Sequence, residues 1–288
     1  GLVEAVEQNQ GVHPGIHQSR RQVGEAGEVG TQFDRQRNAH LFAHVAHQVK
    51  VSLLQFLRAD GGVGGDVIDV QFQPVGAGFF PGSNGDTDAH RAISTFPAAP
   101  AQYLWHRNTD LAGADAVIIP GGFSYGDYLR CGAIARFSPI MQAVKDFAAD
   151  GGLVMGICNG FQTLTEAGLL PGALIRNTGL KFVCRYVNLR VENADTPFTR
   201  ACADGDVVRI VVKHNEGNYT VDPDTLAAMK ANGQVVLRYC DAEGVPGDAA
   251  NPNGAVEHIA GVCNETRNVL GMMPPPANSV AAALAGGA

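Results

Sequence analysis

The stretch GLVMGICNGFQTL, Gly152 to Leu164, joins a short apolar run to a helical pattern through one cysteine flanked by glycines. A G-x-C-x-G at such a junction predicts a nucleophile elbow, a sharp strand-to-helix turn that exposes its central side chain above a sheet. Gly156 and Gly160 suit this turn because a Cβ at either position would crowd the neighbouring backbone. The helix N-terminus that follows predicts a lowered pKa for the Cys158 thiol. The alternative is a buried, inert cysteine between two packing glycines.

The composition excludes several classes of function. The chain has 288 residues, of which 17% are charged, and a net charge of -7, so no basic field attracts nucleic acid or an anionic membrane. No apolar run approaches the roughly 18 residues of a membrane span, and the first residues lack the layout of a signal peptide. We therefore expect a cytoplasmic globular protein whose partners are small molecules or other proteins.

The cysteines do not form a metal-binding or disulfide pattern. The absence of CxxC pairs argues against a zinc ribbon and against a small disulfide scaffold, so no metal site is predicted from them. Five of the six are expected to be reduced, buried, small apolar side chains, and the neighbours of Cys158 set that residue apart. The six are Cys131, Cys158, Cys184, Cys202, Cys240 and Cys263.

Residues 1–74 differ from the rest of the chain, being rich in Gln, Gly and His and free of cysteine. We expect a partly disordered extension that ends in a flexible linker, GGVGGD at 61–66. One helix is predicted within it, over 38–58. Because no carboxylate or cysteine lies nearby, a solvated face is favoured over a metal site for three of its histidines. These are His40, His44 and His47.

From Val75 to residue 288 the chain alternates short apolar runs with helical stretches. This alternation predicts an α/β domain with a mostly parallel sheet and helices on both faces. The first helix is expected to end near Thr95, before Pro97. Helices are further predicted from Pro139 to 150, over 161–167 and from 223 to 232, and strands at 75–80, 116–119, 153–155, 182–191, 207–213, 234–239 and 269–273.

A second glycine-rich turn, Gly121-Gly122-Phe123, follows the predicted strand at 116–119. In a parallel sheet this turn and the cysteine turn open at the same carboxyl edge, where such sheets bind ligands. Backbone N–H groups of this turn, with that of Asn159, are suited to hold a developing oxyanion. The alternative is an ordinary tight loop.

Further motifs resemble, in their order along the chain, those of one family. They are PGSN with Asp86 and Asp88, PGGFSYGDYLRCGAIAR, GICNGFQ, LIRN, FVCRYVNLRVEN, HNEGNY, NPNG and NVLGMMP. The set covers about Val75 to Leu284 and closely resembles the glutaminase subunits of phosphoribosylformylglycinamidine synthase, a family of class I glutamine amidotransferases. Residues 1–74 resemble nothing in that family.

The resemblance implies a flavodoxin-like glutamine amidotransferase domain that serves purine biosynthesis. It implies that Cys158 forms a glutamyl thioester, that the backbone at Gly122 and Asn159 supplies the oxyanion hole, and that Gln162 helps to position glutamine. Ammonia would pass to a synthetase subunit, and the bacterial form also has a small bridging subunit. ATP and magnesium would belong to the synthetase, and no cofactor is implied for this chain.

The resemblance ends at the C-terminal strand. The family has GMMPHPER there, whose His transfers protons to and from the thiol and the leaving ammonia while its Glu fixes the tautomer. This chain has GMMPPPANSV, so Pro275 replaces the His, Ala277 replaces the Glu and Asn278 replaces the Arg. Neither Pro275 nor Ala277 can carry a proton.

Three functions follow from this pattern. The first is a glutaminase subunit with an incomplete triad and much-reduced hydrolysis. The second is a non-catalytic module of the same fold that binds glutamine or docks on the synthetase. The third is a cysteine hydrolase of another amidotransferase-like family, which the purine-specific motifs disfavour. Two histidines follow Cys158 in the chain, His214 and His258. A structural or substrate-binding role is favoured for each over that of a replacement base, which would need hydrogen-bond geometry to the sulfur.

Overall fold

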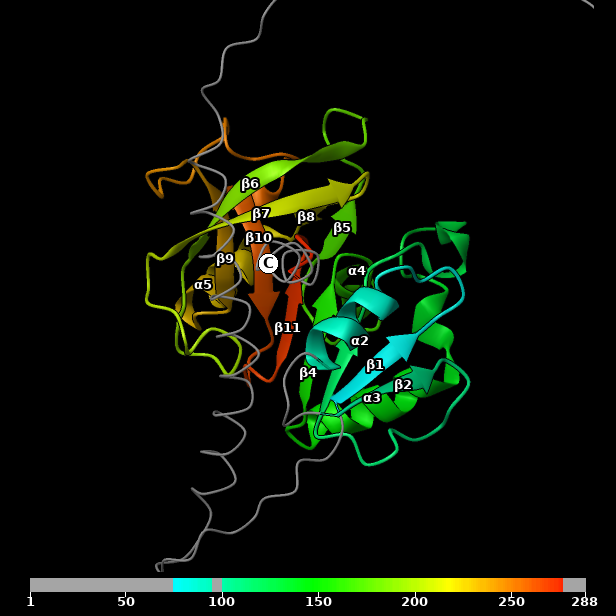
Figure 1. Ribbon diagram of the computed structural model, residues 1–288. Coiled ribbons are helices and arrows are strands. Elements are labelled where there is room, and N and C mark those ends of the chain that lie inside the picture. Colours follow the sequence, from blue (N-terminus) through cyan, green and yellow to red (C-terminus); the bar gives the residue numbers. More distant parts are fainter. Residues whose placement is uncertain (1–74, 95–99, 277–288) are drawn as a thin grey trace, which may run out of the picture.

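The computed structural model describes residues 75–94 and 100–276. These residues form a nine-stranded mixed sheet and a separate two-stranded ribbon (Figure 1). The strand order in the large sheet is β2-β1-β3-β4-β11-β10-β9-β6-β7. The predictions made for residues 1–74, including the helix, the linker and the three histidines, lie outside the described residues.

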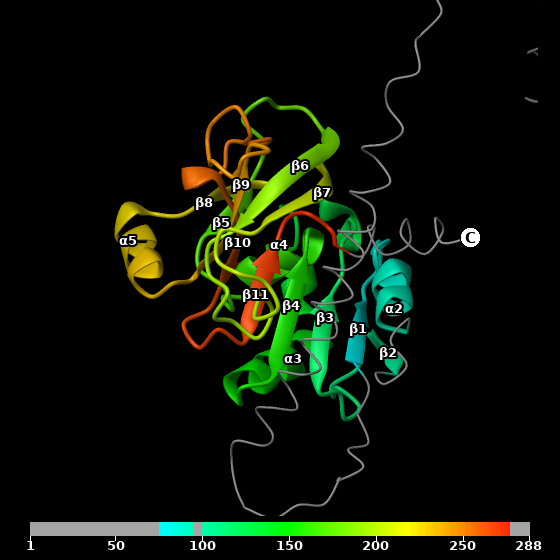
Figure 2. The ribbon, with the colours of Figure 1, turned by 60° about the vertical axis from the view of Figure 1, so that its left-hand side comes forward.

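One half of the sheet is parallel and the other half is antiparallel. Figure 2 shows β11 at the junction, between β4 and β10. The parallel strands are β2 (Ala101–Trp105), β1 (Val75–Phe79), β3 (Ala116–Ile119), β4 (Leu153–Ile157) and β11 (Val269–Met272). The antiparallel strands are β10 (Ile259–Cys263), β9 (Val235–Cys240), β6 (Val183–Val191) and β7 (Val207–His214). The ribbon pairs β5 (Ala173–Ile175) with β8 (Asn218–Thr220).

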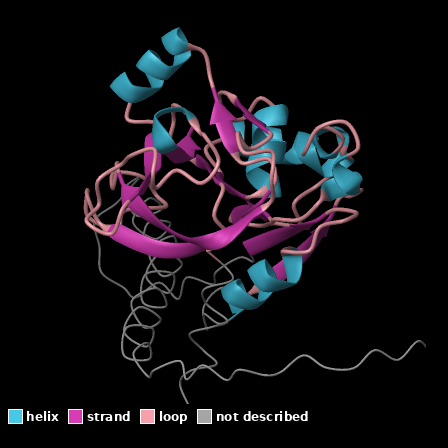
Figure 3. Cartoon of the chain, turned by 90° about the horizontal axis from the view of Figure 1, so that it is seen from above, coloured by secondary structure: helices cyan, strands magenta, loops and turns pink. Residues whose placement is uncertain are grey.

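Helices cover both faces of the parallel half, as predicted (Figure 3). The helix α2 (Asp86–Ser94) connects β1 to β2, whereas α3 (Pro139–Ala149) leads to β4 in the opposite direction along the sheet. Right-handed crossovers in opposite directions place their helices on opposite faces. The helix α4 (Asn159–Glu166) follows β4 on the face of α3, and α5 (Pro223–Ala231) precedes β9.

The ends of α5 illustrate how local sequence defines the helices. The side chain of Asp222 accepts the N–H of Thr225 at 2.9 Å and caps the first turn, and Pro223 begins the helix. The chain leaves the helix through Gly233, whose φ is +66°. These signals were visible in the sequence, and the predicted helix is confirmed.

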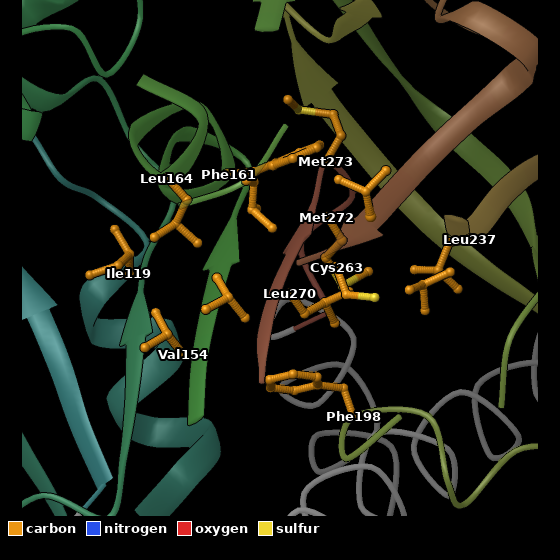
Figure 4. Close-up of a cluster of buried hydrophobic side chains, with 14 of the residues drawn as sticks. Ile119, Val154, Phe161, Leu164, Phe198, Leu237, Cys263, Leu270, Met272 and Met273 are labelled. Carbon is orange, nitrogen blue, oxygen red and sulfur yellow. The ribbon is translucent and has the colours of Figure 1, made fainter. Parts of the chain in front are cut away.

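The core beneath the cysteine turn is built from α4 and the central strands (Figure 4). Phe161 and Leu164 on α4 are buried against strands β3, β4 and β11. Gly271 of β11 lacks a Cβ at the point where the ring of Phe161 packs. Packing of the apolar face of α4 therefore holds the first turn of the helix against the carboxyl ends of these strands.

Some elements differ from the prediction. The strand β4 extends to Ile157 and α4 already begins at Asn159, because the turn between them consists of Cys158 alone. The strands β2, β5, β8 and β10 were not predicted. β2 is buried only at Leu104, and β10 is buried at every position, so neither shows a sustained two-residue alternation.

The substitution Gly160→Ala is expected to lower the free energy of unfolding by about 1–3 kcal/mol, because the new Cβ would overlap the carbonyl oxygen of Ile119. Helix propensity alone favours Ala over Gly, so the two effects have opposite signs. Urea denaturation measures the difference. The control is Gly247→Ala, where a Cβ meets no atom within 4 Å. A Gly160→Ala variant as stable as the parent would contradict this packing.

Candidate active site

A cavity of about 540 Å³ opens at the carboxyl edge of the parallel strands. It is lined by segments that follow β1, β3, β4 and β11 and by the end of β7. Of the residues predicted for the site, Cys158, Gly121, Gly122, Phe123, Gln162 and Pro275 line it. The predicted edge is thus the location of the cavity.

Cys158 occupies a strained turn at the start of α4. Its φ is 53° and its ψ is -105°, a conformation that L-residues rarely adopt. Its N–H donates to the carbonyl of Met272 at 2.8 Å, and its sulfur lies 3.9 Å from the carbonyl oxygen of Lys213. This is the geometry predicted for a nucleophile elbow, and it places the thiol at the cavity wall.

The two glycines that flank the cysteine are required by close backbone approach. A Cβ on Gly156 would lie 2.7 Å from the backbone of Gly160, and one on Gly160 would overlap the carbonyl oxygen of Ile119. The expected crowding is therefore confirmed at both positions.

The Gly121–Phe123 loop lies beside the thiol and is hydrogen-bonded to the segment that follows β1. Phe123 N–H donates to Gly82 at 2.9 Å and Asn84 N–H donates to Gly121 at 3.3 Å, so Ser83 and Gly122 form the non-hydrogen-bonded pair of a small antiparallel bridge. The N–H of Gly122 is not used by this bridge. Gly122 has a φ of +146°, and a Cβ there would lie 2.7 Å from the backbone N of Asn84.

Asn159 links the thiol to the surrounding loops although it is buried and does not line the cavity. Its backbone N–H acts to lower the pKa of the Cys158 thiol. Its side chain accepts the N–H of Ser124 at 3.1 Å and donates to Asp127 at 3.2 Å and to Gln162 at 2.9 Å. The first turn of α4 therefore orients the loop that follows β3.

Gln162 is 5% exposed, and both ends of its amide are engaged. Its Oε1 accepts from Asn159, and its Nε2 donates to the carbonyl of Glu216 at 2.7 Å. The side chain thus fixes the segment after β7 against α4, and it borders the cavity from that position.

The sequence predicted a lowered pKa for the Cys158 thiol, and this prediction is wrong. Burial raises the pKa of the thiol to about 11, and the negative charge of Asp127 acts in the same direction. The N–H of Asn159 and the charge of Lys213 act in the lowering direction that the helix terminus predicts, but they are smaller. Removal from water is the stronger effect, and the end of β7 contributes to it because the carbonyl of Lys213 lies against the sulfur.

The histidines after Cys158 lie in different places. His214 lines the cavity, whereas His258 contacts Asn251 at 3.3 Å and Asp248 at 3.7 Å and is not a lining residue. His214 is buried, and burial lowers its pKa, so it is neutral at pH 7. Its Nε2 faces the amide of Asn253 at 3.1 Å.

Pro275 stands where the resemblance places the triad histidine. It follows β11 by three residues and lines the cavity that contains Cys158. Its ring offers no proton acceptor. Ala277 and Asn278 lie outside the described residues.

Four charged or thiol side chains of the cavity were not singled out from the sequence: Asp127, Cys131, Lys213 and Glu216. Asp127 and Cys131 lie within PGGFSYGDYLRCGAIAR, and Lys213 and Glu216 lie within KHNEGNY. The motifs marked these segments, but no local pattern indicates that the two segments meet.

Among the described residues, no group of three His, Cys, Asp or Glu is placed to hold a metal ion. The described helices include none with the length and apolar character needed to cross a membrane.

The fold and the cysteine turn define a glutamine amidotransferase domain. In agreement, the model of the CobB/CobQ-like glutamine amidotransferase domain matches residues 77–284. Among individual proteins, the phosphoribosylformylglycinamidine synthase subunit PurQ of Koribacter versatilis is 57% identical over 197 residues, which are 68% of this chain and 85% of the relative. The PurQ subunit of Salinibacter ruber is 58% identical over 207 residues, 72% of this chain and 88% of the relative.

A solved structure agrees with these relatives. In the structure of PurLQS from Thermotoga maritima, one chain is 39% identical and superimposes with a TM-score of 0.63, covering 74% of this chain and 100% of that chain. The chain therefore belongs to the PurQ family of phosphoribosylformylglycinamidine synthase subunits.

The raised pKa predicts how the thiol reacts with pH. Because the reactive thiolate is a minor species below pH 11, the rate of Cys158 alkylation by iodoacetamide should rise about tenfold per pH unit between pH 7 and 10. Mass spectrometry of the peptide that contains Cys158 follows the reaction, and Cys158→Ser removes the product. A rate that is already constant from pH 7 upward would contradict burial as the dominant effect.

Proposed function

We propose that the chain is the subunit that releases the amide nitrogen of glutamine as ammonia, for use by the synthetase subunit of phosphoribosylformylglycinamidine synthase in purine biosynthesis. The observation that carries the proposal is the position of Cys158. Its thiol lies on a strained turn at a helix N-terminus, at the wall of a cavity that is large enough for an amino acid. Family membership supports the same conclusion.

The chemistry begins with addition of the Cys158 thiolate to the side-chain amide carbon of glutamine. The N–H groups of Gly122 and Asn159 stabilise the oxyanion that forms, which is why the unused N–H of Gly122 supports this assignment. The C–N bond then breaks, and the nitrogen leaves as ammonia after it receives a proton. Water cleaves the resulting glutamyl thioester, which yields glutamate and regenerates the thiol.

The proton transfers are the reaction steps for which this chain lacks the expected groups. Pro275 and Ala277 cannot take the thiol proton or return one to the leaving nitrogen, and loss of a general base costs on the order of 10² to 10⁴ in rate. His214 lies in the same cavity, but its Nε2 is engaged by Asn253. Hydrolysis by this chain is therefore proposed to be slow.

A second candidate is a non-catalytic module of the same fold that binds glutamine or docks on the synthetase. Pro275 is the observation that favours it, because a cavity that has lost its base keeps its binding groups. In either case we propose a synthetase subunit and a small bridging subunit as partners. ATP and magnesium would act in the synthetase, and this chain would need no cofactor.

Restoring the base separates the two candidates. Pro275→His with Ala277→Glu is expected to raise the rate of glutamate release from glutamine by about 10² to 10⁴, because it returns the proton acceptor to the cavity edge. An enzyme-coupled glutamate assay measures the rate, with and without the synthetase subunit.

The matched control carries Cys158→Ser in addition to the two substitutions and should release no glutamate. A double variant no faster than the parent would mean that the missing triad does not limit the reaction. A parent chain that binds glutamine and releases no glutamate would favour the binding module.

A further inference from the structure

The loop that carries the N–H of Gly122 continues into a turn of three consecutive residues with left-handed backbone. The φ angles are 55° for Tyr125, 74° for Gly126 and 52° for Asp127. Glycine adopts this conformation without steric cost, whereas a bulky aromatic residue rarely adopts it. Strained backbone persists only where the surrounding structure holds it, and it is concentrated at functional sites. The conformation of Tyr125 therefore requires an interaction that stabilises it.

The side chain of Tyr125 makes that interaction. Its hydroxyl lies 2.7 Å from Nδ1 of His106 and 2.8 Å from Oγ of Ser138, and its ring packs edge-on against the imidazole with 5.6 Å between the centroids. His106 follows β2 and is 7% exposed, and Ser138 precedes α3 and is 5% exposed. Loss of the hydroxyl would remove a hydrogen bond from each of these two buried polar groups.

Ser138 binds Tyr125 rather than capping its own helix. It occupies the N-cap position of α3, where a serine hydroxyl ordinarily accepts an N–H of the first helical turn. Within the described part of the chain, its side chain makes no such cap hydrogen bond, and its hydroxyl contacts Tyr125 instead. A residue typical of a helix start is thus used to hold the turn that follows β3.

The backbone of the same loop is fixed on the side of β1. The carbonyl of Gly121 accepts the N–H of Gly85 at 3.0 Å. Because the peptide is planar and trans, the N–H of Gly122 points to the opposite side of the chain. The N–H of Tyr125 donates to the carbonyl of Pro81 at 2.6 Å. A displacement of Tyr125 would therefore pull on this loop and turn the N–H of Gly122.

We propose that Tyr125 is a positioning residue of the oxyanion hole. Its hydroxyl, bound by His106 and Ser138, holds the strained turn in place. The turn keeps the N–H of Gly122 directed at the carbonyl oxygen of a group that Cys158 attacks. The inference rests on the proposed function, since it takes Gly122 as an oxyanion donor. Loss of the hydroxyl should slow those reactions of the thiol that form an oxyanion and spare those that form none.

The network acts through geometry and not through charge. Burial, together with the charge of Arg107, lowers the pKa of His106, so the imidazole is neutral at pH 7. The charges that act on the pKa of the Cys158 thiol are those of Asp127 and Lys213. Removal of the tyrosine hydroxyl therefore leaves the thiolate population unchanged.

The test compares two reactions of Cys158 in the full chain at the same pH. 4-Nitrophenyl acetate acylates the thiolate through an oxyanion and expels 4-nitrophenolate, a leaving group that needs no general acid. Iodoacetamide alkylates the same thiolate by displacement of iodide, and no oxyanion forms. Mass spectrometry of the peptide that contains Cys158 gives both rates, and their ratio cancels the thiolate population. N-acetylcysteine supplies the ratio for a thiol without an oxyanion hole.

Tyr125→Phe is expected to lower the ratio of acylation to alkylation at least about tenfold, toward the value for N-acetylcysteine, because a displaced donor stabilises the oxyanion less. Ser138→Ala removes one of the two hydrogen bonds and should lower the ratio by a smaller factor. The matched control is Tyr128→Phe, which changes the next tyrosine along the chain. Its side chain is 86% exposed, and the variant should keep the parent ratio.

A ratio that is unchanged in Tyr125→Phe would overturn the inference and leave the proposed function standing. Equal losses in both rates would also overturn it, because they would show damage to the fold and no specific effect on the oxyanion. A parent ratio equal to that of N-acetylcysteine would show that the cavity lacks an oxyanion hole. That result would overturn the mechanism of the proposed function together with this inference.

Discussion

The close approach between Gly160 and the carbonyl oxygen of Ile119 is the contact on which the site depends. It allows the first turn of α4 to lie directly against the ends of β3 and β4, and the buried side chains of Phe161 and Leu164 hold it there. The chain must then turn from strand to helix within one residue. Cys158 takes the strain, and its N–H is fixed by the carbonyl of Met272 on the next strand.

This turn also orders the loops around it. The side chain of Asn159 fixes the backbone of Ser124 and the carboxylate of Asp127, and the segment after β1 clamps Gly122 from the other side. Gln162 attaches the segment after β7 to the same helix. The cavity is therefore preorganised by one helical turn, without need of a ligand to assemble it.

The sequence predicted the parts of this arrangement that depend on neighbouring residues. The elbow, the capped helix α5 and the parallel strands β1, β3, β4 and β11 follow from spacing and from glycine or proline at turns, and their positions are confirmed. Three of the four strands in the antiparallel half were predicted, but their antiparallel pairing and the raised pKa of Cys158 were not. Both arise from long-range pairing, since the segment that covers the sulfur lies 55 residues further along the chain. The meeting of Asp127 and Glu216 has the same origin.

The structure separates the position of the base from its chemistry. Position 275 is held at the cavity because β11 pairs with β4 and Met272 binds the N–H of Cys158, and none of these contacts needs a particular side chain at 275. In the function that we propose, a proline there leaves proton transfer without its base, while the thiol and the N–H of Gly122 stay in place. Under this proposal, binding and turnover depend on different residues of one cavity, and loss of turnover does not imply loss of binding.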